Sequence, residues 1–101
     1  METYTLRAPI NLSASGDNTV IAADTGKRII LHKVQIWSNG SVTLKLLEGD
    51  TAFNGAGFLM AAGSHFFDIG EPLALAPSKA FVINLSANVV VTGFVLYVVE
   101  V

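Results

Sequence analysis

The stretch Arg28–Glu48, RIILHKVQIWSNGSVTLKLLE, decides the fold class of this sequence. Apolar and polar residues alternate along both of its halves, with the period of two that is typical of strands with one buried face. Between the halves stands Asn39-Gly40, the pair that most often fills a two-residue hairpin loop because both residues tolerate positive φ. We therefore predict strands over 28–38 and 41–48, joined by a type I′ turn.

The alternation also assigns side chains to faces. In 41–48 the apolar set is Val42, Leu44 and Leu46, opposed by Thr43 and Lys45. Strict alternation through 28–38 divides that strand into two sets. They are Ile30, His32, Val34 and Ile36 on the more apolar face, and Ile29, Leu31, Lys33, Gln35 and Trp37 on the other.

The rest of the chain contains strand-like segments and no helical pattern. Six further runs rich in Val, Ile, Thr and Phe lie between clusters of Gly, Asn, Asp, Ser and Pro, at 3–12, 19–23, 57–61, 65–69, 80–86 and 89–101. Turn signals at roughly ten-residue intervals predict an all-β fold, an antiparallel β-sandwich of about eight strands that is jelly-roll-like. An immunoglobulin-like sandwich is the alternative. The length of 101 residues fits a single β-sandwich domain over 1–101.

The composition predicts that another protein covers part of the surface. Hydrophobic residues make up 51% of the chain and charged residues only 14%, against a usual charged share of about 25%. The most apolar run, 89–99, is too short for a membrane-spanning helix and is interrupted by Thr92 and Gly93. Because both faces of this last strand are apolar, we predict that a second subunit covers one of them. The candidate oligomer-interface residues are Val90, Phe94, Leu96 and Val98.

Charged and reactive residues favour no catalytic, metal or nucleic-acid site. The net charge is −2 and the six cations are scattered, whereas nucleic-acid binding favours a basic face. Cysteine is absent and the two histidines, His32 and His65, stand far apart in the sequence, so a zinc site is not expected. We predict no enzyme and no cofactor.

Two weaker patterns contain residue types that a catalytic or metal site could use. Ser64, His65 and Asp68 are the residue types of a hydrolase triad, but Ser64 and His65 point to opposite faces of an extended strand. Asp17, Asn18 and Asp24 could supply oxygen ligands to calcium, yet their spacing is not that of an EF-hand loop. Aspartates in turns more often bond to nearby backbone amides.

Two segments, DNTVIAADTGKRIILHKVQIWSNGSVTLKLLEGDT and GEPLALAPSKAFVINLSANVVVTGFVLYVVEV, extend over most of 17–101. Their succession of strand motifs, through the GEPLAL turn to the final V-x-G-x-V-x-Y strand, resembles small jelly-roll virion proteins of tailed bacteriophages, the capsid decoration or cement proteins. This resemblance implies a homotrimer on the capsid surface that stabilises the capsid by bridging major capsid subunits. It also implies a protein made in the host cytoplasm and located in the virion.

Within that resemblance, residues 1–12 are a candidate N-terminal arm or exchanged edge strand. Thr3, Leu6, Arg7 and Pro9 are its candidate capsid contacts, and an ordinary edge strand protected by Pro9 is the equal alternative. Trp37 is a candidate exposed aromatic contact or a packing residue. The alternative function is a carbohydrate- or receptor-binding module of a virion tail or fibre. No nucleic-acid or membrane partner is expected.

Overall fold

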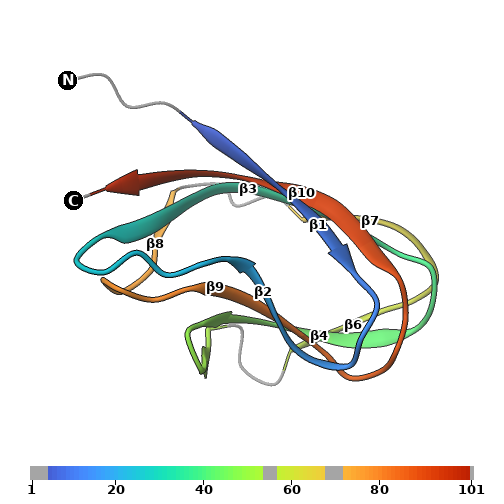
Figure 1. Ribbon diagram of the computed structural model, residues 1–101. Helices are drawn as coiled ribbons and strands as arrows, with labels where there is room; N and C mark the ends of the chain where they lie inside the picture. Colours follow the sequence, from blue (N-terminus) through green and yellow to red (C-terminus); the bar gives the residue numbers. More distant parts are fainter. Residues whose placement is uncertain (1–4, 54–56, 68–71, 101) are drawn as a thin grey trace.

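The protein is an antiparallel β-sandwich (Figure 1). The computed structural model describes residues 5–53, 57–67 and 72–100, with the backbone alone at 58, 60 and 64–67. Within these ranges the strands are β1 Leu6–Leu12, β2 Gly16–Ile21, β3 Arg28–Ser38, β4 Val42–Glu48, β5 Thr51–Ala52, β6 Phe58–Met60, β7 Gly63–Phe67, β8 Leu73–Ala74, β9 Phe81–Leu85 and β10 Val91–Glu100. The predicted all-β sandwich is confirmed.

The ten strands form two sheets. Sheet A has the order β1-β10-β3-β7, with β8 also paired to β3, and sheet B has the order β2-β9-β4-β5, with β6 also paired to β4. The chain changes sheets at six of its nine connections, so most neighbours within a sheet are distant in sequence. Among the described residues, no helix is long and apolar enough to cross a membrane.

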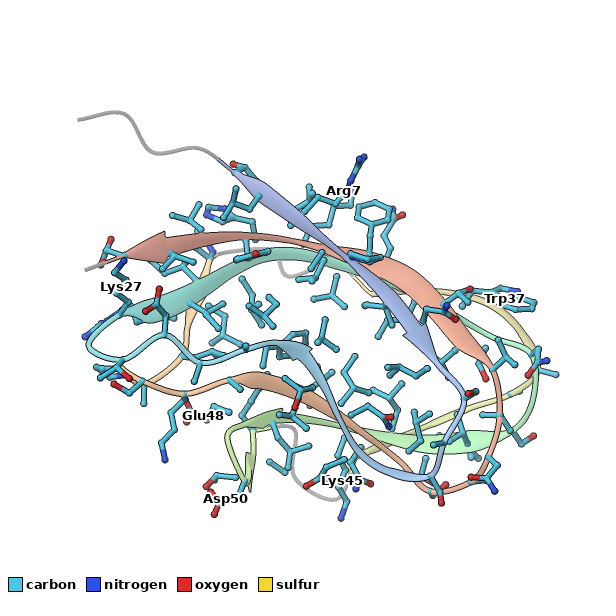
Figure 2. All side chains as sticks on the ribbon, viewed as in Figure 1. Arg7, Lys27, Trp37, Lys45, Glu48 and Asp50 are labelled. Carbon is cyan, nitrogen blue, oxygen red and sulfur yellow. The ribbon has the colours of Figure 1, made fainter. Side chains whose placement is uncertain are left out.

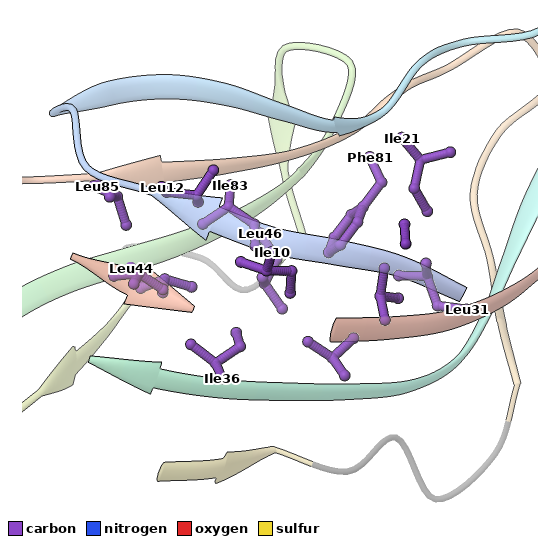
Figure 3. Packing of buried hydrophobic residues seen from close by; sticks show 14 of the residues in the cluster. Ile10, Leu12, Ile21, Leu31, Ile36, Leu44, Leu46, Phe81, Ile83 and Leu85 are labelled. Carbon is purple, nitrogen blue, oxygen red and sulfur yellow. The ribbon is translucent and has the colours of Figure 1, made fainter. Parts of the chain in front are cut away.

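The core fills the space between the sheets (Figure 3). Sheet A contributes Ile10, Leu31, Val34, Ile36 and Val95 from its three long strands, and sheet B contributes Leu44, Leu46, Phe81, Ile83 and Leu85. In β4 the predicted inward set Val42, Leu44 and Leu46 is confirmed. Burying apolar area at about 25 cal/mol per Å² is the main force that holds the sheets together.

The stretch at Asn39-Gly40 is a corner between sheets, and the predicted type I′ hairpin is wrong. Strand β3 lies in sheet A and β4 in sheet B, so the two are not paired. Neither Asn39 nor Gly40 has the positive φ that a type I′ turn requires. Instead the Asn39 N–H donates to the Val90 carbonyl and the Val90 N–H donates to Asn39 Oδ1, both at 3.0 Å.

At this corner the chain passes close to the segment before β10. A Cβ built on Gly40 would lie 2.8 Å from Val89 Cγ1. Ser38 is fully buried and its Oγ donates to the Gly40 carbonyl at 2.6 Å, which closes the corner. The Asn-Gly pair correctly predicts that the strand ends here and that the chain turns. The local sequence does not determine whether the next strand pairs with β3 or crosses to the other sheet.

A β-bulge in β3 corrects the predicted division of that strand into faces. Leu96 of β10 lies opposite Lys33, whereas Tyr97 lies opposite Leu31, so His32 is an extra residue in β3. An extra residue moves every following side chain to the other face. Ile29 and Leu31 are therefore buried at 2% and 0% exposure beside Val34, and not on the outer face where strict alternation placed them.

Strand β10 is central in sheet A, where it pairs with β1 on one side and β3 on the other. Gly93 makes the pairing with β3 fit. Its φ is +152°, and a Cβ there would lie 1.9 Å from the Gln35 carbonyl oxygen. Only a residue without a side chain allows the two backbones to approach this closely.

The predicted strand bounds agree best where the alternation is longest. The strand predicted at 28–38 is confirmed as β3, and the other seven predicted segments each overlap one observed strand. The two-residue strands β5 and β8 were not predicted, because two residues are too few to display a period. Leu6–Leu12 is an edge strand of the chain's own sheet A. Of the two alternatives for the N-terminal segment, this is the ordinary edge strand and not the exchanged arm.

Candidate functional site: the outer face of sheet A

One face of the sandwich combines apolar and polar side chains, and none of the described strands forms a second layer over its middle. We call it the outer face of sheet A, defined by Arg7, Pro9 and Asn11 of β1, by Thr92, Phe94 and Leu96 of β10, and by Lys33, Gln35 and Trp37 of β3. Each of these residues lies next to at least one buried residue of its strand, so its side chain points away from the core. In Figure 2, Arg7 and Trp37 both project from this side of the sandwich, opposite to Lys45 and Asp50.

The register arranges these residues in rows across the three strands. Pro9, Phe94 and Gln35 form the middle row. Residues directly opposite in neighbouring strands have Cβ atoms about 4.5–5.5 Å apart, so each row is a contiguous surface. The two flanking rows are Arg7, Leu96 and Lys33 on one side and Asn11, Thr92 and Trp37 on the other.

The structure brings together candidates that the sequence listed separately. Phe94 and Leu96, expected at an oligomer interface, lie half-buried in the centre of the face, directly opposite Pro9 and Arg7. These two residues of β1 were expected to contact a capsid. One of the two apolar faces predicted for the last strand points into the core, where Val91 and Val95 are fully buried.

Other candidates fall outside this cluster. Val90 precedes β10 and belongs to the corner at Asn39, with 37% of its surface exposed. Val98 is on the outer side of β10 but only 8% exposed, so little of it is available to a partner. Leu6 lies opposite Tyr97, in line with the core side of β1, and Thr3 lies outside the described residues.

Trp37 stands at one end of the outer face with 38% of its surface exposed. Thr92 lies directly opposite it on β10, and the backbone of Ser64 lies opposite it on β7. An indole that keeps more than a third of its surface in solvent is an exposed side chain and not part of the core. The expectation of an exposed aromatic is met by the geometry, and what it contacts stays a prediction.

The outer face of sheet B combines one pair of bonded polar groups with the exposed Leu59 of β6, which lies opposite Thr43 and keeps 74% of its surface in solvent. Asp17, Asn84 and Lys45 lie in one row across β2, β9 and β4. Asn84 Nδ2 donates to Asp17 Oδ1 at 2.7 Å. The carboxylate of Asp17 is thus engaged within its own sheet.

Neither of the two weaker chemical patterns is assembled in the part of the chain that the structure describes. The backbones of Ser64 and His65 lie in β7, their side chains are not described, and Asp68 lies outside the described residues. Asp17 is in β2, whereas Asp24 is seven residues further along, in a loop where it forms an ion pair with Lys27 at 3.6 Å. The described residues contain no group of three or more His, Cys, Asp or Glu side chains able to hold a metal ion.

Sequence reasoning missed the polar members of the outer face. Gln35, Asn11 and Thr92 complete the rows around Phe94, yet none was singled out. Their period-two spacing from Trp37, Pro9 and Phe94 was visible in the sequence. What the sequence did not reveal is the pairing of β1 with β10, which joins residues that are 79 to 91 positions apart.

Comparisons with models of protein families, with curated proteins and with solved structures found no match to this chain.

Proposed function

We propose that the protein is a structural component of a bacteriophage virion, a capsid decoration or cement protein that self-associates and stabilises the capsid by bridging major capsid subunits. The observation that carries this proposal is the outer face of sheet A, where Phe94 and Leu96 are partly exposed at the centre and Trp37 keeps 38% of its surface in solvent. An apolar surface rimmed by polar residues is typical of a protein–protein contact. The homotrimer implied by the sequence resemblance belongs to the proposal as its expected state.

The connectivity of the strands supports the same proposal. If the short strands β5 and β6 are taken as one position and β7 and β8 as another, the sheet orders are 1-8-3-6 and 2-7-4-5. We interpret this order as that of a jelly roll, a double-sheet architecture found in viral capsid proteins and also in lectins and cupins. The fold is shared by unrelated functions, so the face and not the fold carries the argument.

Adhesion through several copies suits a protein of this size. One small domain offers a single partner only a modest contact, whereas linked copies bind at high effective concentration and their affinities multiply. A cement protein would gain its strength in this way.

The proposal is tested on purified virions of the phage whose genome encodes the chain. Mass spectrometry should find the chain in the particles, and purified protein added to particles that lack it should co-sediment with them and raise the temperature at which they release DNA. Particles that contain no copy and do not bind the added protein would refute a virion role. If the chain were found in isolated tails and not in heads, the protein would be assigned to the tail and not to the capsid.

The exposure of Trp37 favours one alternative, a carbohydrate- or receptor-binding module of a tail or fibre. An exposed indole beside the hydroxyl of Thr92 and the amide of Gln35 offers the stacking surface and polar groups that sugars need. Binding on a glycan array that disappears in Trp37→Ala would establish this function. An array without signal for the wild-type protein would exclude it for the glycans tested.

A further inference from the structure

We propose that Asn39-Gly40 is a site of spontaneous deamidation, which the corner between the two sheets slows and which disrupts the corner once it has occurred. Asparagine followed by glycine offers this reaction the least steric hindrance, because glycine has no Cβ beside the backbone nitrogen that attacks. The chain has two such pairs, and the second, Asn54-Gly55, lies outside the described residues. The proposal concerns the stability of the chain itself and is independent of the adhesive function.

The reaction needs only the chain and water. Hydroxide takes the proton of the Gly40 N–H, and the nitrogen attacks Cγ of Asn39. A bond forms between this nitrogen and Cγ, the bond from Cγ to Nδ2 breaks, and Nδ2 leaves as ammonia with a proton from water. Water then opens the resulting succinimide ring. Opening at Cγ gives aspartate, and opening at the main-chain carbonyl of residue 39 gives isoaspartate, in which the main chain runs through Cγ. Either product adds one negative charge to a chain whose net charge is −2.

The corner leaves the reacting groups accessible to water. Asn39 is exposed, and its Nδ2, the leaving group, makes no hydrogen bond to any residue that the structure describes. The Gly40 N–H donates to Ser38 Oγ at 3.3 Å, which is longer than the usual range for such a bond, so the attacking nitrogen is held only weakly. Water can therefore reach both the nitrogen that attacks and the amide that leaves.

The hydrogen bonds of the corner nevertheless slow the reaction. Ring closure brings the Gly40 nitrogen to bonding distance of Asn39 Cγ, which requires the side chain and the peptide that follows it to rotate. This rotation breaks two hydrogen bonds, the one from the Val90 N–H to Asn39 Oδ1 at 3.0 Å and the one from the Gly40 N–H to Ser38 Oγ. A net hydrogen bond stabilises the closed corner about five-fold, so the two bonds should slow the reaction about 30-fold.

The isoaspartate product does not fit the closed corner. Its main chain is longer by one carbon between residues 39 and 40, so Gly40 cannot keep its position while residue 39 stays bonded to Val90. That position is closely confined, because the buried Ser38 donates to the Gly40 carbonyl at 2.6 Å and a Cβ built on Gly40 would lie 2.8 Å from Val89 Cγ1. The aspartate product keeps the ordinary main chain and an Oδ that accepts from the Val90 N–H. Only isoaspartate should therefore open the corner.

The first experiment compares deamidation in the folded protein with deamidation in the urea-unfolded chain, in a mildly alkaline buffer. Trypsin places the two Asn-Gly pairs on separate peptides, 34–45 and 46–79, and mass spectrometry follows the change from amide to acid in each. In urea, Asn39 and Asn54 should react at similar rates. In the folded protein, Asn39 should react about 30-fold more slowly than in urea. An unreactive Asn39 in urea, or equal rates for Asn39 in the two states, would overturn the proposal.

The second experiment distinguishes the corner from the general stability of the fold. Ser38→Ala removes the acceptor of the Gly40 N–H and should raise the folded-state rate at Asn39 about five-fold. Ser86 Oγ accepts from the Thr43 N–H at 2.8 Å and does not bond to the reacting groups, so Ser86→Ala is the matched control and should leave the rate unchanged. A rate in Ser38→Ala equal to that of the wild type, or the same increase in both variants, would refute the role of the corner.

The third experiment does not depend on the folding of Ser38→Ala. A chain carrying Asn54→Gln, in which only one Asn-Gly pair can react, is aged in urea, and its isoaspartate form is isolated and refolded. This form should have a urea midpoint about 1 M below that of the same chain carrying Asn39→Asp, which represents the other product. Equal midpoints would show that isoaspartate fits the corner and would overturn this part of the proposal.

Discussion

Replacing Gly93 with alanine should cause one of the largest losses of stability available from a single added methyl group. The new Cβ would lie 1.9 Å from the Gln35 carbonyl oxygen, in the middle of the pairing between β10 and β3. Forcing extra atoms into a packed site costs about 1–3 kcal/mol, and a positive φ at a non-glycine residue costs about 1–3 kcal/mol more. We expect a loss of about 4 kcal/mol, a large part of the roughly 5–15 kcal/mol that holds a small domain folded.

The assay is equilibrium unfolding in urea, followed by tryptophan fluorescence at Trp37 and by circular dichroism. With a slope of about 2 kcal/mol per M, the midpoint of Gly93→Ala should fall by about 2 M. Coincident transitions by the two probes establish that a two-state treatment is valid.

Two other glycines separate the contributions to this loss. Gly16 has φ +94° but no atom within 4 Å of a built Cβ, so Gly16→Ala should show the conformational cost alone, about 1–2 kcal/mol. Gly40 lacks a positive φ, and its Cβ would meet only the movable side chain of Val89, so we expect about 1 kcal/mol. A Gly93→Ala midpoint no lower than that of Gly16→Ala would refute the close approach of β10 to β3.

Two further predictions concern the loops. Ser78 has φ +63°, and its Oγ accepts a hydrogen bond from the Gly26 N–H at 2.8 Å. Ser78→Ala should lose about 1 kcal/mol of stability because the hydrogen bond is lost. Ser78→Gly should be nearly neutral, because glycine relieves the backbone strain and so offsets the lost hydrogen bond. Equal urea midpoints for the two variants would contradict this prediction. Asn39→Ala should lose about 1 kcal/mol because the Val90 N–H loses its acceptor, and Asn39→Asp, which keeps an Oδ, should recover most of it; thermal melts that rank the two variants in the opposite order would contradict the role of Oδ1.

The fold class could be predicted from the sequence because strands that bury one face display their period directly. The bounds of β3 and the inward set of β4 follow from alternation alone. Alternation failed at His32, because a bulge is a property of the pairing with β10 and leaves no trace in β3 itself. It failed again at Asn39-Gly40, where the same two residues serve a corner between sheets.

Several residues of the candidate site could be predicted from the sequence, but their position on one common surface could not. Phe94 and Leu96 were recognised from the second apolar face of their strand, and Arg7 and Pro9 from the N-terminal segment. That these residues form one surface depends on β1 lying beside β10. Pairing between the first and last strands is decided by the whole set of sheet contacts, which no local pattern encodes.

The position of β10 has a consequence for how the chain reaches its fold during synthesis. Sheet A cannot be joined until residues 91–100 have been made, since β10 separates β1 from β3. Until then both of these strands have unpaired edges and uncovered apolar sides, the state in which nascent β proteins aggregate. Such non-local pairing also slows folding, to milliseconds or seconds in small β-sandwiches. Completion of sheet A should therefore wait for the synthesis of residues 91–100, and the folding yield should depend on temperature and on chaperones that protect the unfinished sheet.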